Sequence, residues 1–335
     1  MAQAPSRIAF MGTPDFAASI LNRVLAWPGG QVVGVYSQPD RPSGSGNKIV
    51  FSPVKALALE HGIEVFQPVS FRDEEAVAQL AGLRPDFLLV AAYGLILPQR
   101  VLDLPKYPPL NVHGSILPKY RGAAPIQRAI MENWDVGAES GVSIMHMEAA
   151  LDSGPVFRVV REPIGRHTGG SLHDALSTLG GEALCAVMDD LVAGRAHSEA
   201  QEHASATYAA KLRKEDGQIL WDRPVLAVDA HVRGVTPWPG AQVVFSFSER
   251  QEPILGRVLP GHVSDDCCVA VEPGTLALAA NGALRVACAD RWYVLEHVRP
   301  QGRKEMPSAD FVRGLRLFST SGIVGRIGQF PCHAQ

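Results

Sequence analysis

The segment that decides the fold is residues 7–37, RIAFMGTPDFAASILNRVLAWPGGQVVGVYS. Arg7–Met11 is a short apolar run, and Phe16–Trp27 places apolar residues at helical spacing. Gln31–Ser37 is apolar and rich in valine, which favours a strand. A strand, a helix and a second strand in this order predict the start of a parallel sheet, because a helix carries the chain back between parallel strands.

The same alternation continues toward the middle of the chain. Further helices are predicted at 53–61, 73–83, 125–133 and 170–193, and further strands at 64–66, 86–92, 140–147 and 155–164. We therefore predict an α/β fold with a doubly wound, mostly parallel sheet. Ligands bind such sheets at the carboxyl ends of the strands. The chemistry is accordingly expected in the loops that follow Met11, Ser37, Ala92 and Val112.

The pattern changes after residue 194. Residues 195–206 are small and polar, which is typical of a linker, and 224–235 predict one more helix. From Ala241 short β-rich runs follow one another at 242–247, 254–259, 268–272, 276–279, 284–288 and 292–298. Such spacing predicts a small OB-like β-barrel. We predict a first domain at 1–194, a linker at 195–206 and a second domain at 207–335.

Composition narrows the class of protein. Of 335 residues, 46% are hydrophobic and 19% are charged, which suits two globular domains. No run of eighteen apolar residues and no signal peptide is present, so we expect no membrane association. Five irregularly spaced cysteines favour a reducing, cytoplasmic location without a metal site. The net charge of −3 means that any contact with nucleic acid must come from local basic patches.

The densest polar motif is Asn111-Val112-His113-Gly114-Ser115. It follows a predicted strand, and alternation places Asn111 and His113 on one face. An amide and an imidazole that point together into a crevice suit carbonyl chemistry, because the amide binds a developing oxyanion and the imidazole moves a proton. A structural histidine that caps a strand end is the other interpretation of this motif.

Asp152 lies in the sequence Leu-Asp-Ser-Gly, between two predicted strands. A carboxylate near His113 would orient the imidazole and favour its protonated form. An Asx-turn is the alternative for this aspartate. Arg121, which precedes a predicted helix, could bind an acidic substrate group, although a surface arginine is the more common interpretation of such a residue.

Three stretches carry candidate contacts to a polyanion. The loop 38–48 is long for a βα connection and contains Arg41 and Lys48. Two short basic clusters lie later in the chain, one made of Lys211, Arg213 and Lys214 and the other of Arg299, Arg303 and Lys304. A flexible surface loop and solvated charged faces are the alternatives for these stretches.

These segments together resemble the methionyl-tRNA formyltransferases over roughly residues 6–318. The resemblance rests on the following stretches: GTPDFA at 12–17, QPDRP at 38–42, SPVK at 52–55, AYGLILP at 92–98, residues 111–124, GVSIM at 141–145, LDSG at 151–154, TPWPG at 236–240 and QGRK at 301–304. The motif Asn-x-His-x-Ser-x-Leu-Pro is shared with all transferases that use 10-formyltetrahydrofolate, whereas the 38–42 loop and the second domain are narrower signals.

The resemblance implies a Rossmann-like formyltransferase domain with Asn111, His113 and Asp152 as catalytic residues. It implies that 10-formyltetrahydrofolate lies beside Ser115, Ile116, Leu117 and Pro118 and beside the loop residues Tyr93, Gly94, Leu95 and Leu97. It also implies that the loop around Arg41 and Lys48 reaches the acceptor end of methionyl initiator tRNA. From their charge, we predict further contacts of this tRNA with the second domain at Lys211, Arg213, Lys214, Arg303 and Lys304. We expect a monomer.

Two departures from the family pattern and three other classes of protein bear on this prediction. The stretch 43–48 is poor in charge, and Pro155 stands where an acidic residue is usual. A formyltransferase for sugar nucleotides or glycinamide ribonucleotide would need no barrel and no long loop. A tRNA-binding protein without catalysis would not need Asn111, His113 and Asp152. A dehydrogenase would need a glycine fingerprint, which residues 12–15 do not provide.

Overall fold

A computed structural model describes residues 4–43, 48–317 and 322–330, which form two compact units. The first unit contains residues up to Pro125 together with 140–162 and 173–209, and the second contains 126–139, 163–172 and the remainder. The segments 126–139 and 163–172 thus pack with the carboxyl-terminal part of the chain. Residues 173–209, which include the predicted linker, pack with the amino-terminal part.

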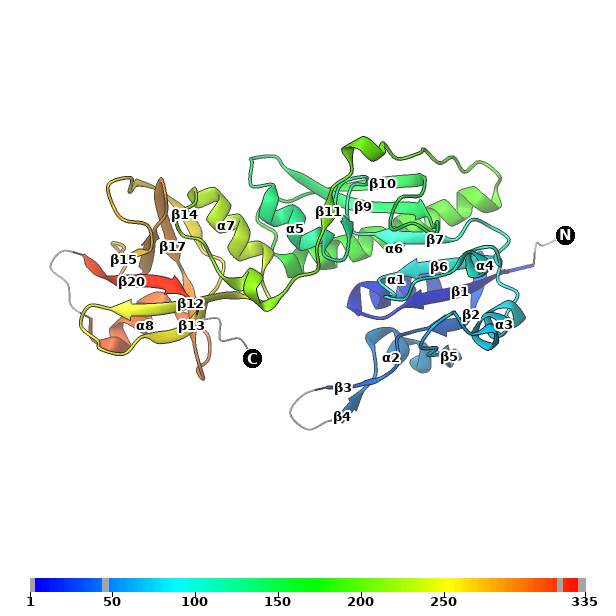
Figure 1. The fold of residues 1–335 in the computed structure, drawn as a ribbon, viewed down its shortest axis with the longest axis horizontal. Coiled ribbons are helices and arrows are strands. Elements are labelled where there is room, and N and C mark those ends of the chain that lie inside the picture. The colour runs from blue at the N-terminus through cyan, green and yellow to red at the C-terminus, as the bar shows by residue number, and fades with distance from the viewer. Residues whose placement is uncertain (1–3, 44–47, 318–321, 331–335) are drawn as a thin grey trace. The chain divides into compact units, whose positions relative to one another are not determined.

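The first unit is built on a seven-stranded sheet (Figure 1). Its order is β10 (Val156–Pro163), β9 (Glu139–His146), β7 (Leu110–His113), β6 (Phe87–Ala91), β1 (Ser6–Gly12), β2 (Gly30–Tyr36) and β5 (Val65–Phe66). The strands from β7 to β5 pair in parallel, whereas β9 is antiparallel to β7. Because β1, β2 and β6 are parallel, the loops that follow them lie at one edge of the sheet. The order of the strands reverses around β1, at this same place.

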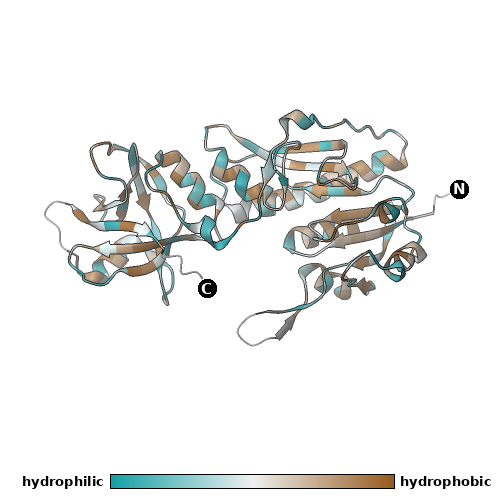
Figure 2. Cartoon of the chain, in the orientation of Figure 1, coloured by the Kyte–Doolittle hydropathy of each residue, from teal (hydrophilic) through white to brown (hydrophobic). Residues whose placement is uncertain are grey.

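Helices cover both faces of this sheet. On one face, Ala9 and Met11 of β1 belong to an apolar cluster with residues of α3 (Glu74–Gly82) and α4 (Gln99–Leu102). On the other face lie α1 (Asp15–Leu25) and α6 (Gly169–Val192). Helix α2 (Pro53–Glu60) is capped by Ser52, whose hydroxyl accepts a hydrogen bond from the Lys55 N–H. The central strands are coloured mostly as hydrophobic in Figure 2, as expected for strands buried on both faces, whereas β10 at the edge has no buried residue.

Helix α6 lies close to the sheet because of one glycine. A Cβ atom at Gly180 would stand 2.8 Å from Val112 Cγ1 of β7 and 3.3 Å from Val142 Cγ2 of β9. These separations are shorter than van der Waals contact, so a larger residue would push the helix away. Gly180 therefore allows α6 to pack closely against β7, which carries Asn111 and His113, and against its neighbour β9.

Two small strand pairs extend the unit. Strands β3 (Arg41–Ser43) and β4 (Lys48–Val50) form an antiparallel hairpin, which projects away from the sheet in Figure 1. The sequence predicted only a long loop here, because three-residue strands are too short to show a period. Strand β8 (Arg121–Gly122) pairs in parallel with β11 (Tyr208–Ala209).

The second unit contains an antiparallel sheet of nine strands that curls around one apolar core. The order is β14 (His262–Cys267), β17 (Arg291–Leu295), β16 (Leu284–Ala287), β15 (Thr275–Leu278), β20 (Ile323–Gln329), β12 (Ala241–Phe247), β13 (Ile254–Val258), β18 (His297–Pro300) and β19 (Met306–Pro307). The core also receives residues of α7 (Val225–Gly234) and α8 (Ser308–Leu315). Helix α5 (Pro125–Glu132) belongs to this unit from Ile126 onward, and short 3₁₀ helices lie at His203–Ser205 in the first unit and Lys214–Gly217 in the second.

The predicted fold class, a doubly wound sheet followed by an OB-like unit, is confirmed. One predicted strand, 268–272, is wrong, because β14 ends at Cys267 and the Val271 N–H then bonds back to the Cys268 carbonyl in a turn. Strand β20 and helix α8 were not predicted. Among the described helices, none is both long and apolar enough to cross a membrane.

Candidate active site

The candidate site begins at the end of β7. Asn111 and His113 are two residues apart on this strand, so they share one face. In the antiparallel pairing with β9, Asn111 stands opposite Met145 and His113 opposite Ser143. Asn111 is half-buried and His113 is buried.

His113 lies between a backbone carbonyl and a carboxylate. Its Nε2 is 2.8 Å from the Tyr120 carbonyl oxygen, which requires Nε2 to carry the proton and donate it. Its Nδ1 faces Asp152 Oδ2 at 3.8 Å. The two side chains are only 7% and 13% exposed, so solvent screens their interaction weakly. This distance exceeds that of a hydrogen bond and leaves Nδ1 available to a reacting group.

Asp152 is held by contacts at both its side chain and its backbone. The Gly122 N–H donates to Asp152 Oδ2 at 2.8 Å. Gln201 Nε2 donates to the carbonyl oxygens of Asp152 and Gly154, at 2.9 and 2.8 Å. Asp152 has a φ of +48°, a left-handed conformation that aspartate tolerates better than most residues. The predicted catalytic trio therefore includes one His–Asp pair in direct proximity.

The turn after His113 is fixed by hydroxyl groups. Ser115 Oγ donates to the Lys119 carbonyl at 2.6 Å, and Ser143 Oγ donates to the Ser115 carbonyl at 2.7 Å. The Leu117 N–H in turn donates to Ser143 Oγ. Leu117 and Pro118 line a cavity of about 330 Å³, whereas Ile116 is half-buried. The hydroxyl of Ser115 is thus committed to holding the turn in shape.

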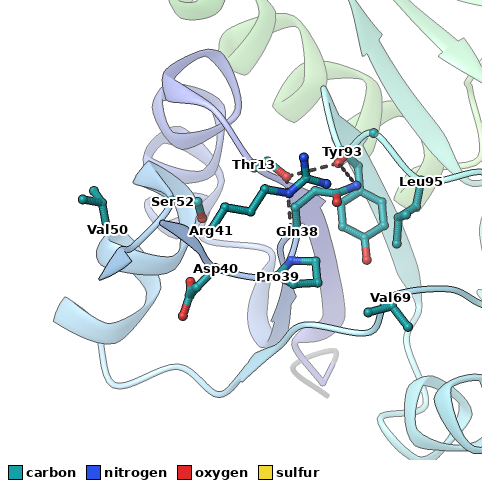
Figure 3. Close-up of a pocket in the computed structure, with 11 residues that line it drawn as sticks. Thr13, Gln38, Pro39, Asp40, Arg41, Val50, Ser52, Val69, Tyr93 and Leu95 are labelled. Atoms are coloured by element: carbon teal, nitrogen blue, oxygen red, sulfur yellow. Dashed lines mark hydrogen bonds between the residues drawn. The ribbon is translucent and has the colours of Figure 1, made fainter. Parts of the chain in front are cut away.

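A larger cavity, of about 630 Å³, lies at the loops that follow β1, β2 and β6 (Figure 3). Hydrogen bonds join these loops, because Thr13 Oγ1 and Gln38 Nε2 both donate to the Tyr93 carbonyl oxygen. Arg41 from β3 also lines the cavity. This position, at the carboxyl ends of parallel strands around the reversal of strand order, is where doubly wound folds bind ligands.

The predicted folate-side loop meets this cavity only in part. Tyr93, Gly94 and Leu95 line it, whereas Leu97 is 4% exposed and packs in the apolar cluster beneath the sheet. Burial raises the pKa of the Tyr93 phenol, which is therefore protonated at neutral pH. Its hydroxyl has no hydrogen-bond partner among the described residues.

A polar cluster holds the chain just before the hairpin β3–β4. Lys55 Nζ bonds Asp40 Oδ2 at 2.5 Å and Gln67 Oε1 at 2.8 Å. Gln67 Nε2 also donates to Asp40 Oδ1 at 2.9 Å. The hydrogen bonds that Asp40 accepts from Lys55 and from Gln67 hold its pKa below its usual value. Arg41 follows directly and is exposed. The backbone of Lys48 lies in β4, but its side chain is outside what the structure describes.

The basic residues of the second unit that were predicted to contact tRNA are all exposed. They are Lys211, Arg213, Lys214, Arg303 and Lys304. Arg303 lines a groove of about 330 Å³ together with Arg257 of β13 and Arg299 of β18. Arg299 has a carboxylate nearby, Glu305 at 3.8 Å.

Several groups at the site were not identified from the sequence. They are the carbonyl of Tyr120, the N–H of Gly122 and the side chain of Gln201. Arg121, for which an acidic substrate was suggested, is 4% exposed, and its guanidinium donates to Gln201 Oε1 at 2.8 Å and to His203 Nδ1 at 2.9 Å. Its role in this structure is to hold Gln201.

Comparisons with known proteins agree with this geometry. The family model described as formyl transferase matches residues 6–188, and the model of the formyl transferase C-terminal domain matches 211–316. The chain belongs to the formyl transferase family. A methionyl-tRNA formyltransferase from Desulfovibrio desulfuricans is 50% identical to this formyl transferase over 325 residues, covering 95% of each chain. One from Pseudomonas paraeruginosa is 45% identical, covering 96% of this chain and 100% of the relative.

Solved structures show that the fold of this formyl transferase is shared more widely. A sugar 3N-formyl transferase, solved with dTDP and 5-N-formyl-THF, aligns with a TM-score of 0.61 at 14% identity, covering 90% of this chain and 100% of the other. An N-formyltransferase from Helicobacter canadensis aligns with a TM-score of 0.62, also at 14% identity, covering 89% of this chain and 100% of the other. Within the described residues of this formyl transferase, no group of three or more His, Cys, Asp or Glu side chains is placed to hold a metal ion.

Proposed function

We propose that this chain transfers the formyl group of 10-formyltetrahydrofolate to the α-amino group of methionyl initiator tRNA. The names of relatives that are 42–50% identical over nearly the whole chain support this acceptor. The observation that carries the proposal is the His113–Asp152 pair beside Asn111, at the end of a strand in a folate-using fold.

The reaction needs three things of the protein. The α-amine nitrogen attacks the formyl carbon, and a tetrahedral intermediate with a negative oxygen forms. The bond from that carbon to N10 of the folate then breaks, the amine loses one proton and N10 gains one. The protein must therefore stabilise the oxyanion, receive a proton from the amine and hold both substrates in line.

The residues at the end of β7 suit these tasks. With Nε2 donating to the Tyr120 carbonyl, a protonated His113 directs Nδ1–H toward the space near Asp152. Asn111 and this N–H stabilise the oxyanion. Asp152 stabilises the imidazolium and takes the amine proton, directly or through water. Preorganised donors of this kind are each worth about 10²–10³ in rate.

The donor and the acceptor end of the tRNA are assigned to neighbouring surfaces of the first unit. The turn 115–118 and the loop 93–97 flank the folate. The cavity lined by Arg41 shares Tyr93, Gly94 and Leu95 with that loop and receives the aminoacyl end, with the hairpin β3–β4 and Lys48 along the acceptor stem. An exposed arginine on a projecting hairpin suits contact with phosphates.

Further phosphate contacts are assigned to the second unit. Lys211, Arg213 and Lys214 follow the segment 201–209 directly in the chain, and Arg303 and Lys304 lie on the loop before β19. The groove that Arg303 forms with Arg257 and Arg299 concentrates positive charge, which suits a phosphodiester backbone.

We propose that the protein acts as a monomer in the cytoplasm. The four described cysteines, Cys185, Cys267, Cys268 and Cys288, are free thiols, and Cys332 is outside the described residues.

The test is formyl transfer from radiolabelled 10-formyltetrahydrofolate to three acceptors under one set of conditions. They are methionyl initiator tRNA, methionyl elongator tRNA and an amino-sugar nucleotide. Transfer to the initiator tRNA at the highest kcat/KM is expected. Transfer to the sugar nucleotide alone would contradict the tRNA acceptor and identify an amino-sugar nucleotide as the acceptor. If none of the three amines is formylated, the proposed transferase activity toward these acceptors is wrong.

A further inference from the structure

The stretch 201–209, which spans the end of the predicted linker and the start of the predicted second domain, lies along the candidate catalytic loop. Its strand β11 pairs with β8, with Tyr208 opposite Arg121 and Ala209 opposite Gly122. The Arg121 N–H donates to the Thr207 carbonyl at 2.8 Å, and the Ala123 N–H donates to the Ala209 carbonyl at 2.9 Å. This stretch is therefore part of the scaffold of the site.

Gln201 supports the Asp152 side of the pair. It is 8% exposed, and all the polar atoms of its side chain are used. Nε2 donates to the carbonyls of Asp152 and Gly154, while Oε1 accepts two bonds from the Arg121 guanidinium. A buried amide with four bonds holds its neighbours firmly, because each lost bond would leave a buried polar group unpaired.

Thr207 supports the Tyr120 side of the pair. Its hydroxyl oxygen accepts a hydrogen bond from the Tyr120 N–H at 2.9 Å. The carbonyl of the same Tyr120 accepts the Nε2–H of His113. The Thr207 hydroxyl therefore holds the peptide unit on the amino side of Tyr120. The peptide unit on its carboxyl side carries the carbonyl that orients the imidazole.

Both partners of His113 have strained backbones. Tyr120 has a φ of +58° and Asp152 a φ of +48°, in the left-handed region that residues with a Cβ disfavour. Such conformations persist only where the surroundings hold them. Gln201 bonds the backbone of one strained residue and Thr207 bonds the backbone of the other.

We infer that Gln201 and Thr207 are positioning residues, which together set the orientation of His113 between Tyr120 and Asp152. They do so through backbone groups, without touching the reacting atoms. The kinetic part of this inference rests on the proposed formyl transfer. The structural part concerns only the imidazole.

The kinetic test uses Gln201→Ala and a matched pair at Thr207. Thr207→Val keeps the shape but removes the hydroxyl, whereas Thr207→Ser keeps the hydroxyl. Gln201→Ala is expected to lower kcat about 10- to 100-fold with each KM changed less than about 3-fold, because misplacing a catalytic group by about 1 Å costs up to about 10² in rate. Thr207→Val is expected to lower kcat about 10-fold, and Thr207→Ser to keep it within about 2-fold of wild type. Ser205→Ala, an exposed change in the same stretch, is the control and keeps wild-type kcat.

The spectroscopic test follows the His113 ring by NMR in protein labelled with ¹⁵N histidine, with signals assigned by comparison with His113→Asn. In the wild type and in Ser205→Ala, the ring shows a protonated Nε2 held in a hydrogen bond. In Gln201→Ala and Thr207→Val, its ¹⁵N signals shift or broaden. Rates are corrected for the folded fraction from thermal melts, and if Gln201→Ala does not fold, the Thr207 pair decides.

Wild-type ring signals in Thr207→Val, or a kcat that falls only with the folded fraction, would overturn the inference. The proposed function fails separately: if the wild type formylates no methionyl-tRNA, the ring signals of the variants still decide whether these residues position His113.

Discussion

The interaction between Asp152 and His113 can be tested by removing one charge. Asp152→Asn keeps an oxygen for the Gly122 N–H, and asparagine tolerates the φ of +48° at least as well as aspartate. At the observed 3.8 Å, a carboxylate and an imidazolium attract by about 4 kcal/mol at an effective dielectric constant of about 20, and by about 1 kcal/mol in water. Since both groups are mostly buried, the loss should lie nearer the larger value.

At about 1.4 kcal/mol for each factor of ten, this loss predicts a fall in kcat of about 10²–10³. The assay is single-turnover formyl transfer with both substrates saturating, so that binding does not contribute. The surface pair His173–Asp174, at 2.9 Å with Asp174 82% exposed, gives the matched control. Asp174→Asn should leave the rate within about 2-fold. A folded Asp152→Asn variant with a rate less than about 5-fold below wild type would refute the electrostatic role of Asp152.

Three further predictions concern the surroundings of the site. Gly122→Ala should lower the free energy of unfolding in denaturant by about 1–3 kcal/mol and abolish most activity. The reason is that Gly122 has a φ of +111° and that a Cβ there would meet the β11 backbone. The control Gly137→Ala, at a φ of +85° with open space around it, should keep its activity. Arg41→Gln should raise KM for methionyl-tRNA at nearly unchanged kcat and reduce the slope of log KM against log salt concentration by about 1. An unchanged slope would contradict a contact between Arg41 and a phosphate. The hydrogen bond from Lys55 lowers the pKa of Asp40 in the folded protein. As the pH falls, the unfolded state therefore binds more protons than the folded state, and the contact stabilises the fold less. Unfolding free energies should therefore fall less steeply toward acid pH in Asp40→Asn than in wild type, and identical slopes would contradict this.

The parts of the fold that the sequence predicts are those with a local period. The strand, helix and strand of residues 7–37 were predicted because their apolar residues recur at fixed spacing. Strand β20 was not predicted because Gly325 and Gly328 interrupt its apolar alternation. The hairpin β3–β4 was missed because its ladder comes from backbone pairing across a glycine-rich connection, which leaves little trace in residue type.

The same limit applies to the site. Alternation along β7 was enough to place Asn111 and His113 on one face. Asp152, 39 residues away in the chain, was named as the carboxylate partner of His113, but the Tyr120 carbonyl that accepts from the ring was not. A backbone carbonyl carries no signal in the sequence. Gln201 lies in a polar stretch whose composition is that of a linker. Only its contacts with Asp152 and Arg121 in the folded protein distinguish it from a linker residue.

The central claim is that Asn111 and His113 act together on one developing oxyanion. The most direct measurement is the single-turnover rate of formyl transfer to methionyl initiator tRNA by Asn111→Ala, His113→Ala and the double variant. We expect each single change to slow transfer about 10²–10³-fold, and the double change to cost less than the product of the two, because groups that act as a unit are not additive. Near-normal transfer by either folded single variant, or a double variant equal to the product of the two, would contradict that claim.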